Sequence, residues 1–408
     1  MKKFNNFLIE QKNTHMEHIE DLVFNEGVTG TRKAIFFLRD LRNMLAGNVK
    51  EGVTTTVKWD GAPAVFVGVD PSDGQFFVAK KGIFNKNPKV YKTPEDVKAD
   101  TSGDLQDKLL IALSEFSKLG IKSGVYQGDL MFTKGDISTE TYDGQKYYTF
   151  QPNTIVYAVP TNTPLGKQIA KAKIGVVWHT TYTGKTFDTM KASFGQNIVS
   201  NFKSVASIWQ DDATYTDVSG KATFTEKETA DVTAHISNAG RIFQKTPAGL
   251  LNAFSENPDL LARTKVFMNS LVRDGQVMNP RNAPKQLMNA LSAYYKKEID
   301  SKKTPASKQT WTEKRNGVMK VFTDYRISDF QNLFMLINEL VNAKNMIVNK
   351  MNEAGALKTF IRTKDGFRVT GQEGFVAIDK IGNAVKIVDR LEFSKANFSA
   401  DVIKGWER

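Results

Sequence analysis

Residues 57–70, VKWDGAPAVFVGVD, place a lysine, an aspartate and a glycine directly before an apolar run. A lysine beside a buried strand is costly to desolvate unless its amine has a role, and an amine that loses its proton is a nucleophile. Lys58 is therefore a candidate nucleophile, Asp60 could orient Lys58 or a ligand, and Gly61 would let the backbone approach that ligand. The alternatives are a surface lysine at a strand end and a turn-forming Asp-Gly pair.

Further short stretches carry related chemistry, in the order Lys80-Lys81-Gly82, Gly128-Asp129, Val176-Val177-Trp178, Glu373-Gly374-Phe375-Val376 and Lys386. A carboxylate such as Glu373 suits a hard cation like Mg²⁺, the shorter carboxylate of Asp129 could hold ribose hydroxyls or a metal-bound water, and lysines neutralise phosphate charge. Turn carboxylates and, for Trp178, core packing are the competing interpretations. His179, next to Trp178, is expected to be a satisfied, half-buried strand histidine.

Composition limits the possible functions. The 408 residues contain no cysteine, which excludes disulfides, thiolate catalysis and cysteine-based metal sites, and the four histidines make a histidine-rich metal site unexpected. No run is long enough to span a membrane and the N-terminus lacks a signal-peptide core, so we expect a cytoplasmic protein without a membrane partner. The net charge of +12 is compatible with a polyanionic partner.

The spacing of apolar residues changes along the chain from helical to strand-like and divides the chain into segments. Helical spacing predicts a pair of N-terminal helices within residues 1–50, broken at NEGVTG. Strand patterns with a helix near 104–118 fill residues 51–194, helical patterns fill 195–357, and strands return in 358–408. The prediction is an α+β protein whose mixed-sheet core is interrupted by a large all-α insertion. If the C-terminal strands close back on the earlier sheet, residues near 58 and residues 373–386 share one site.

In their order, these motifs resemble the covalent nucleotidyltransferase superfamily, which includes ATP-dependent RNA and DNA ligases and mRNA capping enzymes. The resemblance rests on Lys58-Trp-Asp60-Gly61, Gly128-Asp129, the aromatic strand at Trp178, Glu373-Gly-Phe-Val376 and Lys386. The stretch FFVAKKGIF is similar to a turn of T4-type phage RNA ligases, and the whole chain is similar to uncharacterised proteins of large tailed phages, which implies a host cytoplasm. Two positions depart from the pattern: Asp129 replaces a glutamate, and Val388 replaces the second lysine of K-x-K.

The resemblance implies a ligase-type nucleotidyltransferase fold and a role for each matching residue. Lys58 would attack the α-phosphate of ATP and carry AMP, and Glu373 would bind Mg²⁺. The expected nucleotide contacts are Asp60, Gly61, Lys81, Asp129, Trp178, Val376 and Lys386, with Trp178 stacking on adenine and Tyr157 as its rival.

The helical insertion mixes basic and aromatic residues in YYKKEIDSKKTPASKQTWTEKR. Cations that hold phosphates and aromatic rings that stack on bases are typical of nucleic-acid surfaces, so the expected contacts are Lys302, Lys303, Lys314 and Arg315. A solvated helix pair is the alternative. The favoured function is an ATP-dependent polynucleotide ligase, for RNA rather than DNA. An adenylyltransferase acting on a protein or small molecule, and a non-catalytic nucleic-acid-binding phage protein, remain alternatives.

Overall fold

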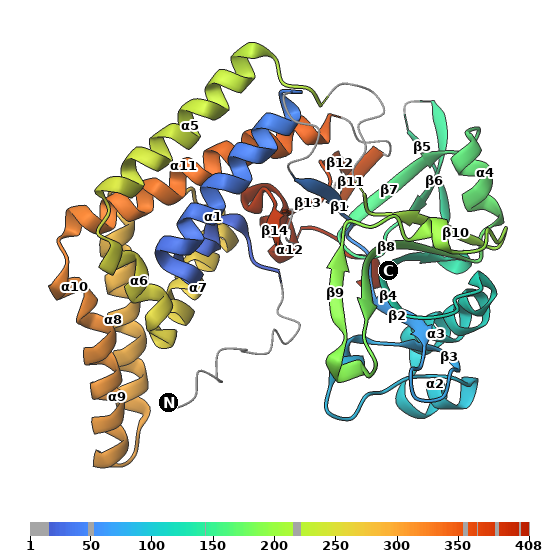
Figure 1. Ribbon diagram of the computed structural model, residues 1–408, viewed down its shortest axis with the longest axis horizontal. Helices are drawn as coiled ribbons and strands as arrows, with labels where there is room; N and C mark the ends of the chain where they lie inside the picture. The colour runs from blue at the N-terminus through green and yellow to red at the C-terminus, as the bar shows by residue number, and fades with distance from the viewer. Residues whose placement is uncertain are drawn as a thin grey trace, which may run out of the picture.

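The computed structural model describes residues 16–47, 53–142, 144–214, 222–353, 358–364, 366–379, 383–399 and 401–407. The predicted α+β class is observed: a helical body lies on one side and a sheet-rich body on the other (Figure 1). No helix in these described ranges is long and apolar enough to cross a membrane.

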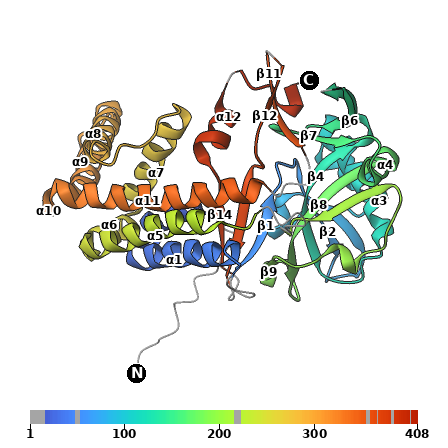
Figure 2. The same cartoon turned by 90° about the horizontal axis from the view of Figure 1, so that it is seen from above.

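The helical body is built from amphipathic helices that bury their apolar faces against one another. Its helices are α1 (Leu22–Leu45), α5 (Glu226–Lys245), α6 (Ala248–Glu256), α7 (Pro258–Arg273), α8 (Ala283–Ser301), α9 (Pro305–Met319), α10 (Val321–Asp324) and α11 (Ile327–Asn352). The Thr225 side chain caps α5 in a capping box with Glu228, and Thr304 caps α9. Helices α1, α5 and α11 run side by side, whereas α8 and α9 form a hairpin at the far end (Figures 1 and 2).

The N-terminal helical segment was predicted as a separate unit, but it packs against the helices of the insertion. A 3₁₀ turn, Ile19–Asp21, leads into α1, and α1 bends at Gly27, whose φ of 55° is not helical. A Cβ atom at Gly27 would lie 2.3 Å from Asn252 Oδ1 in α6, so the bend needs glycine and fits α1 closely against the insertion. The N-terminal segment and the insertion therefore form one helical body.

The core sheet of the second body has the strand order β10-β8-β4-β2-β3, with β9 paired to β8. Its strands are β2 (Ala64–Val69), β3 (Phe76–Ala79), β4 (Val125–Thr133), β8 (Ile174–Thr183), β9 (Lys191–Phe194) and β10 (Ile208–Asp212). Helices α2 (Pro94–Asp100) and α3 (Gly103–Phe116) cover one face, where Phe116 and Leu109 pack against Trp178 and Val176 of β8. Part of the other face borders a cleft.

A further sheet has the order β12-β11-β7-β6-β5, and apolar side chains of its β6 and β7 pack against the core sheet. Its strands are β5 (Ser138–Tyr142), β6 (Gln145–Phe150), β7 (Ile155–Pro160), β11 (Lys358–Thr363) and β12 (Gly366–Val369), and helix α4 (Pro164–Lys171) packs on β6 and β7. After the last strand of the chain, a π-helical turn, Arg390–Ser394, runs into α12 (Lys395–Phe398). Segments distant in sequence thus share this sheet.

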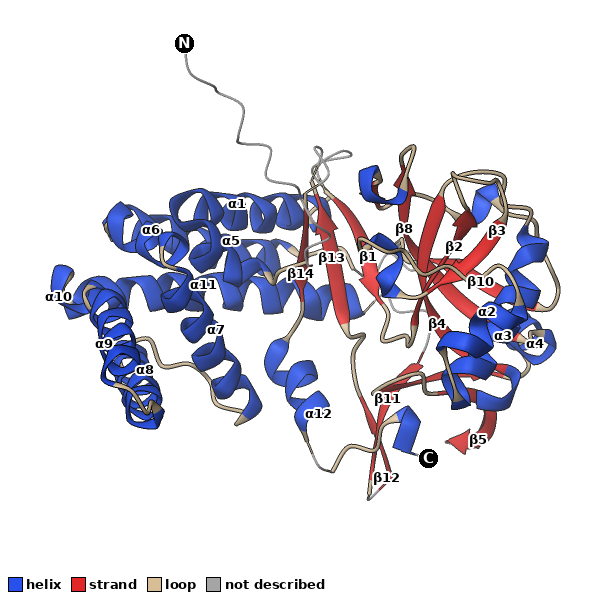
Figure 3. Cartoon of the chain, turned by 90° about the horizontal axis from the view of Figure 1, so that it is seen from below, coloured by secondary structure: helices blue, strands red, loops and turns tan. Residues whose placement is uncertain are grey.

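A small antiparallel sheet, β1-β13-β14, lies between the two bodies (Figure 3). It contains β1 (Thr54–Lys58), β13 (Gly374–Ile378) and β14 (Ala384–Ile387). Phe375 and Ala377 of β13 bury their side chains in the core of the helical body. β13 and β14 thus close back on β1 and bring residues 373–386 beside Lys58, but the three strands form a sheet separate from the core sheet.

The boundary between sheet and helices lies later in the chain than predicted. β10 pairs in parallel with β8, so the core sheet continues beyond residue 194, and the first helix of the insertion begins at Glu226. Ile208 and Trp209 of β10 are buried against the sheet body. The sequence analysis did not predict β10, because a pattern of only five residues does not distinguish a strand from a helix.

Candidate active site

A cleft of about 1720 Å³ opens over the uncovered face of the core sheet. Strands of the core sheet and of the small sheet contribute to its wall. The lining includes Lys58, Ala64, Phe66, Gln127, Asp129, Val177, His179, Tyr182, Val376 and Lys386. A large concave site with a few converging polar groups is the usual form of a ligand-binding site.

Lys58 and Glu373 lie side by side where β1 ends and β13 begins. In the β1–β13 ladder Lys58 lies opposite Gly374, so the residue before Gly374 comes beside the lysine. Lys58 Nζ forms an ion pair with Glu373 Oε1, and the two side chains are 26% and 13% exposed. Gly374 has φ of 150°, and a Cβ atom there would lie 2.6 Å from Val388 Cγ2, so this tight junction requires glycine.

The ion pair changes the titration of both partners. Burial lowers the pKa of Lys58, but the carboxylates of Glu373, Asp129 and Asp60 outweigh burial and raise it above its ordinary value of 10.5. Burial raises the pKa of Glu373 to about 7, against the attraction of Lys58. Lys58 is thus held in its ammonium form within a ring of carboxyl groups.

Asp60 fixes the backbone after Lys58. Its side chain is buried, and its Oδ2 accepts hydrogen bonds from the backbone N–H groups of Thr154 (2.6 Å) and Ile155 (2.7 Å). Its Oδ1 accepts from Asn153 Nδ2 at 2.7 Å. The predicted role as a nucleotide contact is therefore corrected: Asp60 does not line the cleft, and it acts by clamping the Lys58 turn to the start of β7.

Gly61 also serves packing and not an approach to a ligand. A Cβ atom at Gly61 would lie 2.5 Å from Asp129 Cβ and 3.0 Å from the backbone oxygen of Leu130. Gly61 is absent from the cleft lining. The glycine allows the turn after β1 to lie against β4, which brings Lys58 close to Asp129.

Four other predicted residues do line the cleft: Lys81, Asp129, Val376 and Lys386. Val376 pairs with Lys386 across β13 and β14, and the Lys386 backbone N–H donates to the backbone oxygen of Glu17 at 2.9 Å. Burial, followed by the repulsion of Lys58, lowers the pKa of Lys386. The sequence therefore identified residues from five separate segments that converge on one cavity.

Trp178 is placed on the wrong face for the role predicted from the sequence. Its side chain is fully buried on the helix-covered side of β8, packs on Phe116 and Phe202, and donates from Nε1 to Gln210 Oε1 at 3.1 Å. Its rival Tyr157 is also fully buried, and its hydroxyl accepts the backbone N–H of Asp60 at 2.8 Å. Neither ring faces the cleft, so neither stacks on a ligand there.

Aromatic residues that the sequence analysis did not select line the cleft instead. Phe84 and Tyr182 lie with ring centroids 4.6 Å apart, and Phe66 lies 5.6 Å from Phe84. Tyr182 faces the cleft because the β4–β8 ladder has a register shift: Gln127 pairs with Thr180, but Gly128 pairs with Trp178. This β-bulge reverses the alternation of β8 after Trp178. Nothing in the sequence pattern marked its position.

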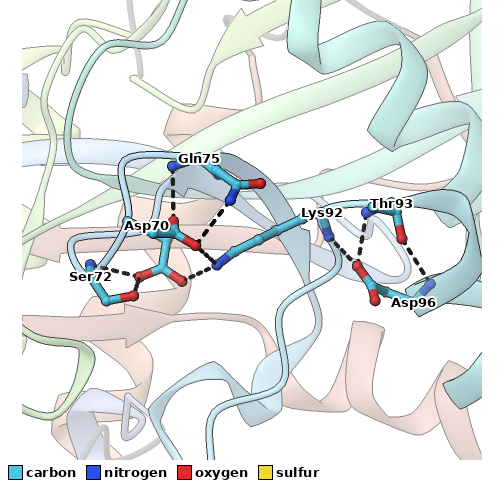
Figure 4. A network of polar contacts seen from close by, with 7 residues as sticks. Asp70, Ser72, Gln75, Lys92, Thr93 and Asp96 are labelled. Carbon is cyan, nitrogen blue, oxygen red and sulfur yellow. Dashed lines mark hydrogen bonds and ion pairs between the residues drawn. The ribbon is translucent and has the colours of Figure 1, made fainter.

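One wall of the cleft is braced by a polar network (Figure 4). Lys92 Nζ bridges Asp70 Oδ2 and Asp73 Oδ2, both at 2.6 Å, and Asp70 Oδ1 also accepts from the Ser72 hydroxyl at 2.6 Å. Asp96 accepts the backbone N–H groups of Lys92 and Thr93 at 2.9 Å at the start of α2. The network ties the β2–β3 turn, where Asp70 and Ser72 line the cleft, to α2.

The basic residues predicted to bind nucleic acid lie around the α8–α9 hairpin (Figure 1), and none of them lines the cleft. Lys302 pairs with Glu298 at 2.8 Å, and Lys302 and Lys314 lie 4.5 and 5.1 Å from the ring centroid of Trp311. Trp311 also packs on Tyr294 and Tyr295. These aromatic rings stabilise the hairpin, whereas Lys303 and Arg315 are exposed.

Two carboxylates lie near Lys58, and carboxylate oxygens are ligands of the kind that Mg²⁺ prefers in proteins. Glu373 is in contact with Lys58, and Asp129, whose side chain is 23% exposed, acts electrostatically on the same amine. Within the described residues no group of three or more His, Asp or Glu side chains forms a metal cage. One or two carboxylates suffice when phosphate oxygens and water complete an octahedral Mg²⁺ site.

The fold and the cleft define an α+β protein with a buried lysine–carboxylate cluster at the junction of two bodies. The chain belongs to a family of unknown function (DUF6267), whose model matches residues 13–402. No curated protein and no solved structure matches it.

Proposed function

We propose that this protein is an ATP-dependent nucleotidyltransferase that forms a covalent lysyl-AMP at Lys58 and passes the AMP to a polynucleotide end. The observation that carries the proposal is the position of Lys58: its amine contacts Glu373 and lies in the same cleft as Asp129, Val376 and Lys386. The ligase-type order of motifs in the sequence supports the same chemistry.

The first step joins Lys58 Nζ to the α-phosphorus of ATP and breaks its bond to the bridging oxygen, releasing pyrophosphate. The amine attacks only after losing its proton to solvent water, so the ion pair with Glu373 opens when ATP enters. Burial lowers the pKa of Lys386, which lies on β14 opposite Val376 of β13. The positive charge of Lys386 would neutralise the phosphates of ATP. Mg²⁺ held by Glu373 would supply charge neutralisation of the phosphates, and Asp129 would hold ribose hydroxyls or a metal-bound water.

The nucleotide base would use the apolar part of the cleft. Phe84 is partly exposed, and its ring lies beside Tyr182. Val376 lies across the cleft on β13. Aromatic and aliphatic surfaces of this kind accept a purine ring without hydrogen-bond readout.

The proposal is tested by incubating the purified protein with Mg²⁺ and α-labelled ATP. We expect a protein-bound label that is labile to acid and stable to base, as a phosphoramidate is, and we expect Lys58→Ala to abolish it. Lys80→Ala is the matched control, because Lys80 pairs with Asp100 at 3.0 Å and does not line the cleft. Labelling that persists in Lys58→Ala, or wild-type protein that no nucleoside triphosphate labels, contradicts the proposal.

The acceptor is identified by offering labelled protein 5′-phosphorylated RNA and DNA strands. Transfer of AMP to a strand supports a polynucleotide ligase and distinguishes RNA, the expected substrate, from DNA. Transfer only to a protein or small molecule would make the protein a different adenylyltransferase.

A further inference from the structure

His179 occupies a special position on β8. In the β4–β8 ladder, Gln127 pairs with Thr180 and Gly128 pairs with Trp178, so the ladder skips His179. A skipped residue in a β-bulge is re-aimed, and bulges are frequent beside active sites. His179 and Thr180 consequently both line the cleft although they are neighbours in sequence.

Gly128 makes this bulge possible. A Cβ atom at Gly128 would lie 2.7 Å from the backbone oxygen of Val177 and 2.8 Å from Cε3 of Trp178. Any side chain there would push Trp178 away from β4 and disturb the register that presents His179. The bulge therefore depends on both strands, on Gly128 in β4 and on the skipped His179 in β8.

The imidazole of His179 is held between two polar partners. Its Nδ1 lies 2.7 Å from Thr180 Oγ1, and its Nε2 lies 3.7 Å from Asp129 Oδ2. If Nδ1–H donates to the Thr180 hydroxyl, Nε2 carries the lone pair and faces the carboxylate. The Nε2 to Oδ2 distance exceeds a hydrogen bond, so a hydroxyl group of a ligand has both atoms within reach.

We propose that His179 is the general base for a hydroxyl acceptor, an inference that rests on the proposed function. In strand joining, the 3′-oxygen forms a bond to the 5′-phosphorus of an adenylylated strand, and the bond from that phosphorus to AMP breaks. The hydroxyl proton moves to His179 Nε2, and AMP leaves as an anion. His179 takes no part in forming lysyl-AMP.

The test separates the chemical steps by supplying a 5′-adenylylated oligonucleotide and a 3′-hydroxyl strand, which bypasses Lys58. We expect His179→Ala to join them at least about 100-fold more slowly than the wild type, the usual loss for a missing general base. Labelling of Lys58 by ATP should stay within about threefold of wild type. Imidazole added to the buffer should restore part of the joining rate, which a purely structural defect would not allow.

His235→Ala is the matched control. His235 also has a carboxylate partner, with Nδ1 2.7 Å from Glu339 Oε2, but it lies in the helical body outside the cleft lining. This variant should join strands at the wild-type rate.

The remaining outcomes are distinguishable. If the wild type joins strands and His179→Ala joins them equally fast, the inference fails and the proposed function stands. If the wild type labels Lys58 but joins no hydroxyl strand, the inference fails because there is no hydroxyl to deprotonate. If the wild type neither labels nor joins, the proposed function fails and the inference with it.

Discussion

Lys58 and Glu373, near opposite ends of the chain, form an ion pair because β1 and β13 are neighbours with Lys58 opposite Gly374. Lys58 lines the cleft and Glu373 does not, and both side chains are largely buried, so the pair belongs to the fold as well as to the site. Removing one partner leaves a poorly solvated charge behind. The sequence analysis assigned Glu373 to Mg²⁺ binding, and the ion pair adds a structural role.

The first prediction follows from the ion pair. We expect Glu373→Ala and Lys58→Ala each to lower the free energy of unfolding by about 1–3 kcal/mol, and the double variant to lose clearly less than the sum. Urea unfolding of the four proteins measures the coupling. Strictly additive losses would show that the contact contributes nothing to stability. Glu373→Ala should also lose most self-adenylation, and normal labelling would remove Glu373 from the site.

The second prediction concerns Asp60, which accepts three hydrogen bonds from Asn153, Thr154 and Ile155. An asparagine offers only one acceptor oxygen, so Asp60→Asn should lower the free energy of unfolding by about 1–3 kcal/mol. ATP labelling should weaken with it, because the turn after Lys58 loses its clamp. A variant that unfolds like the wild type contradicts this role.

The raised pKa of Asp60 predicts that the stability of the protein depends on pH. Burial, opposed by its hydrogen bonds and Lys58, raises the pKa of Asp60 from its ordinary 3.8 to about 6. The folded protein therefore binds this proton more tightly than the unfolded chain. Its contribution to stability is complete below about pH 4 and is lost as pH rises through about 6, by on the order of 3 kcal/mol. The stability of wild type relative to Asp60→Asn should fall between pH 4 and 7, and a flat difference argues against the raised pKa.

The third prediction separates the two faces of β8. Trp178→Phe should lower stability by about 1–3 kcal/mol, because it loses core contacts and the hydrogen bond to Gln210, yet bind ATP as the wild type does. Phe84→Ala should weaken ATP binding about tenfold, as expected for the loss of one stacking ring. Calorimetric titration with a non-hydrolysable ATP analogue measures both. If Trp178→Phe weakened ATP binding and Phe84→Ala did not, the adenine would stack on Trp178 instead.

The fourth prediction concerns the α8–α9 hairpin. Replacing Lys303 and Arg315 by serine should weaken oligonucleotide binding and flatten its dependence on salt, because fewer phosphate contacts release fewer counterions. Replacing Lys302 and Lys314 in addition should also destabilise the hairpin, since both lie over Trp311. Fluorescence anisotropy at several salt concentrations measures the slope.

The control for the hairpin carries the same loss of charge elsewhere. Lys167 and Lys171 are exposed on α4, in the sheet-rich body. Their replacement by serine should leave both affinity and salt slope nearly unchanged. Equal effects from the two pairs would mean that net charge, and not this hairpin, attracts nucleic acid. ATP labelling should be spared in every one of these variants.

The sequence by itself determined the periodic elements and the order of the chemical motifs. Alternation and helical spacing are local properties, so the strands around Lys58, Asp129 and Val376 and most helices of the insertion could be predicted from nearby residues. The strand pattern near the C-terminus indicated a return to the earlier strands, but the sequence did not identify β1 as the partner.

Only the tertiary structure decided which side chains face the cleft. Trp178 faces the core and His179 faces the cleft by ordinary alternation, but the skipped residue reverses the alternation beyond them, so Thr180 and Tyr182 also face the cleft. The partners of Asp60 come from the start of β7, and the bend at Gly27 fits α6, contacts that no local pattern encodes. Register and packing depend on how distant segments share space, and a strand read alone carries no record of where its neighbour slips by one residue.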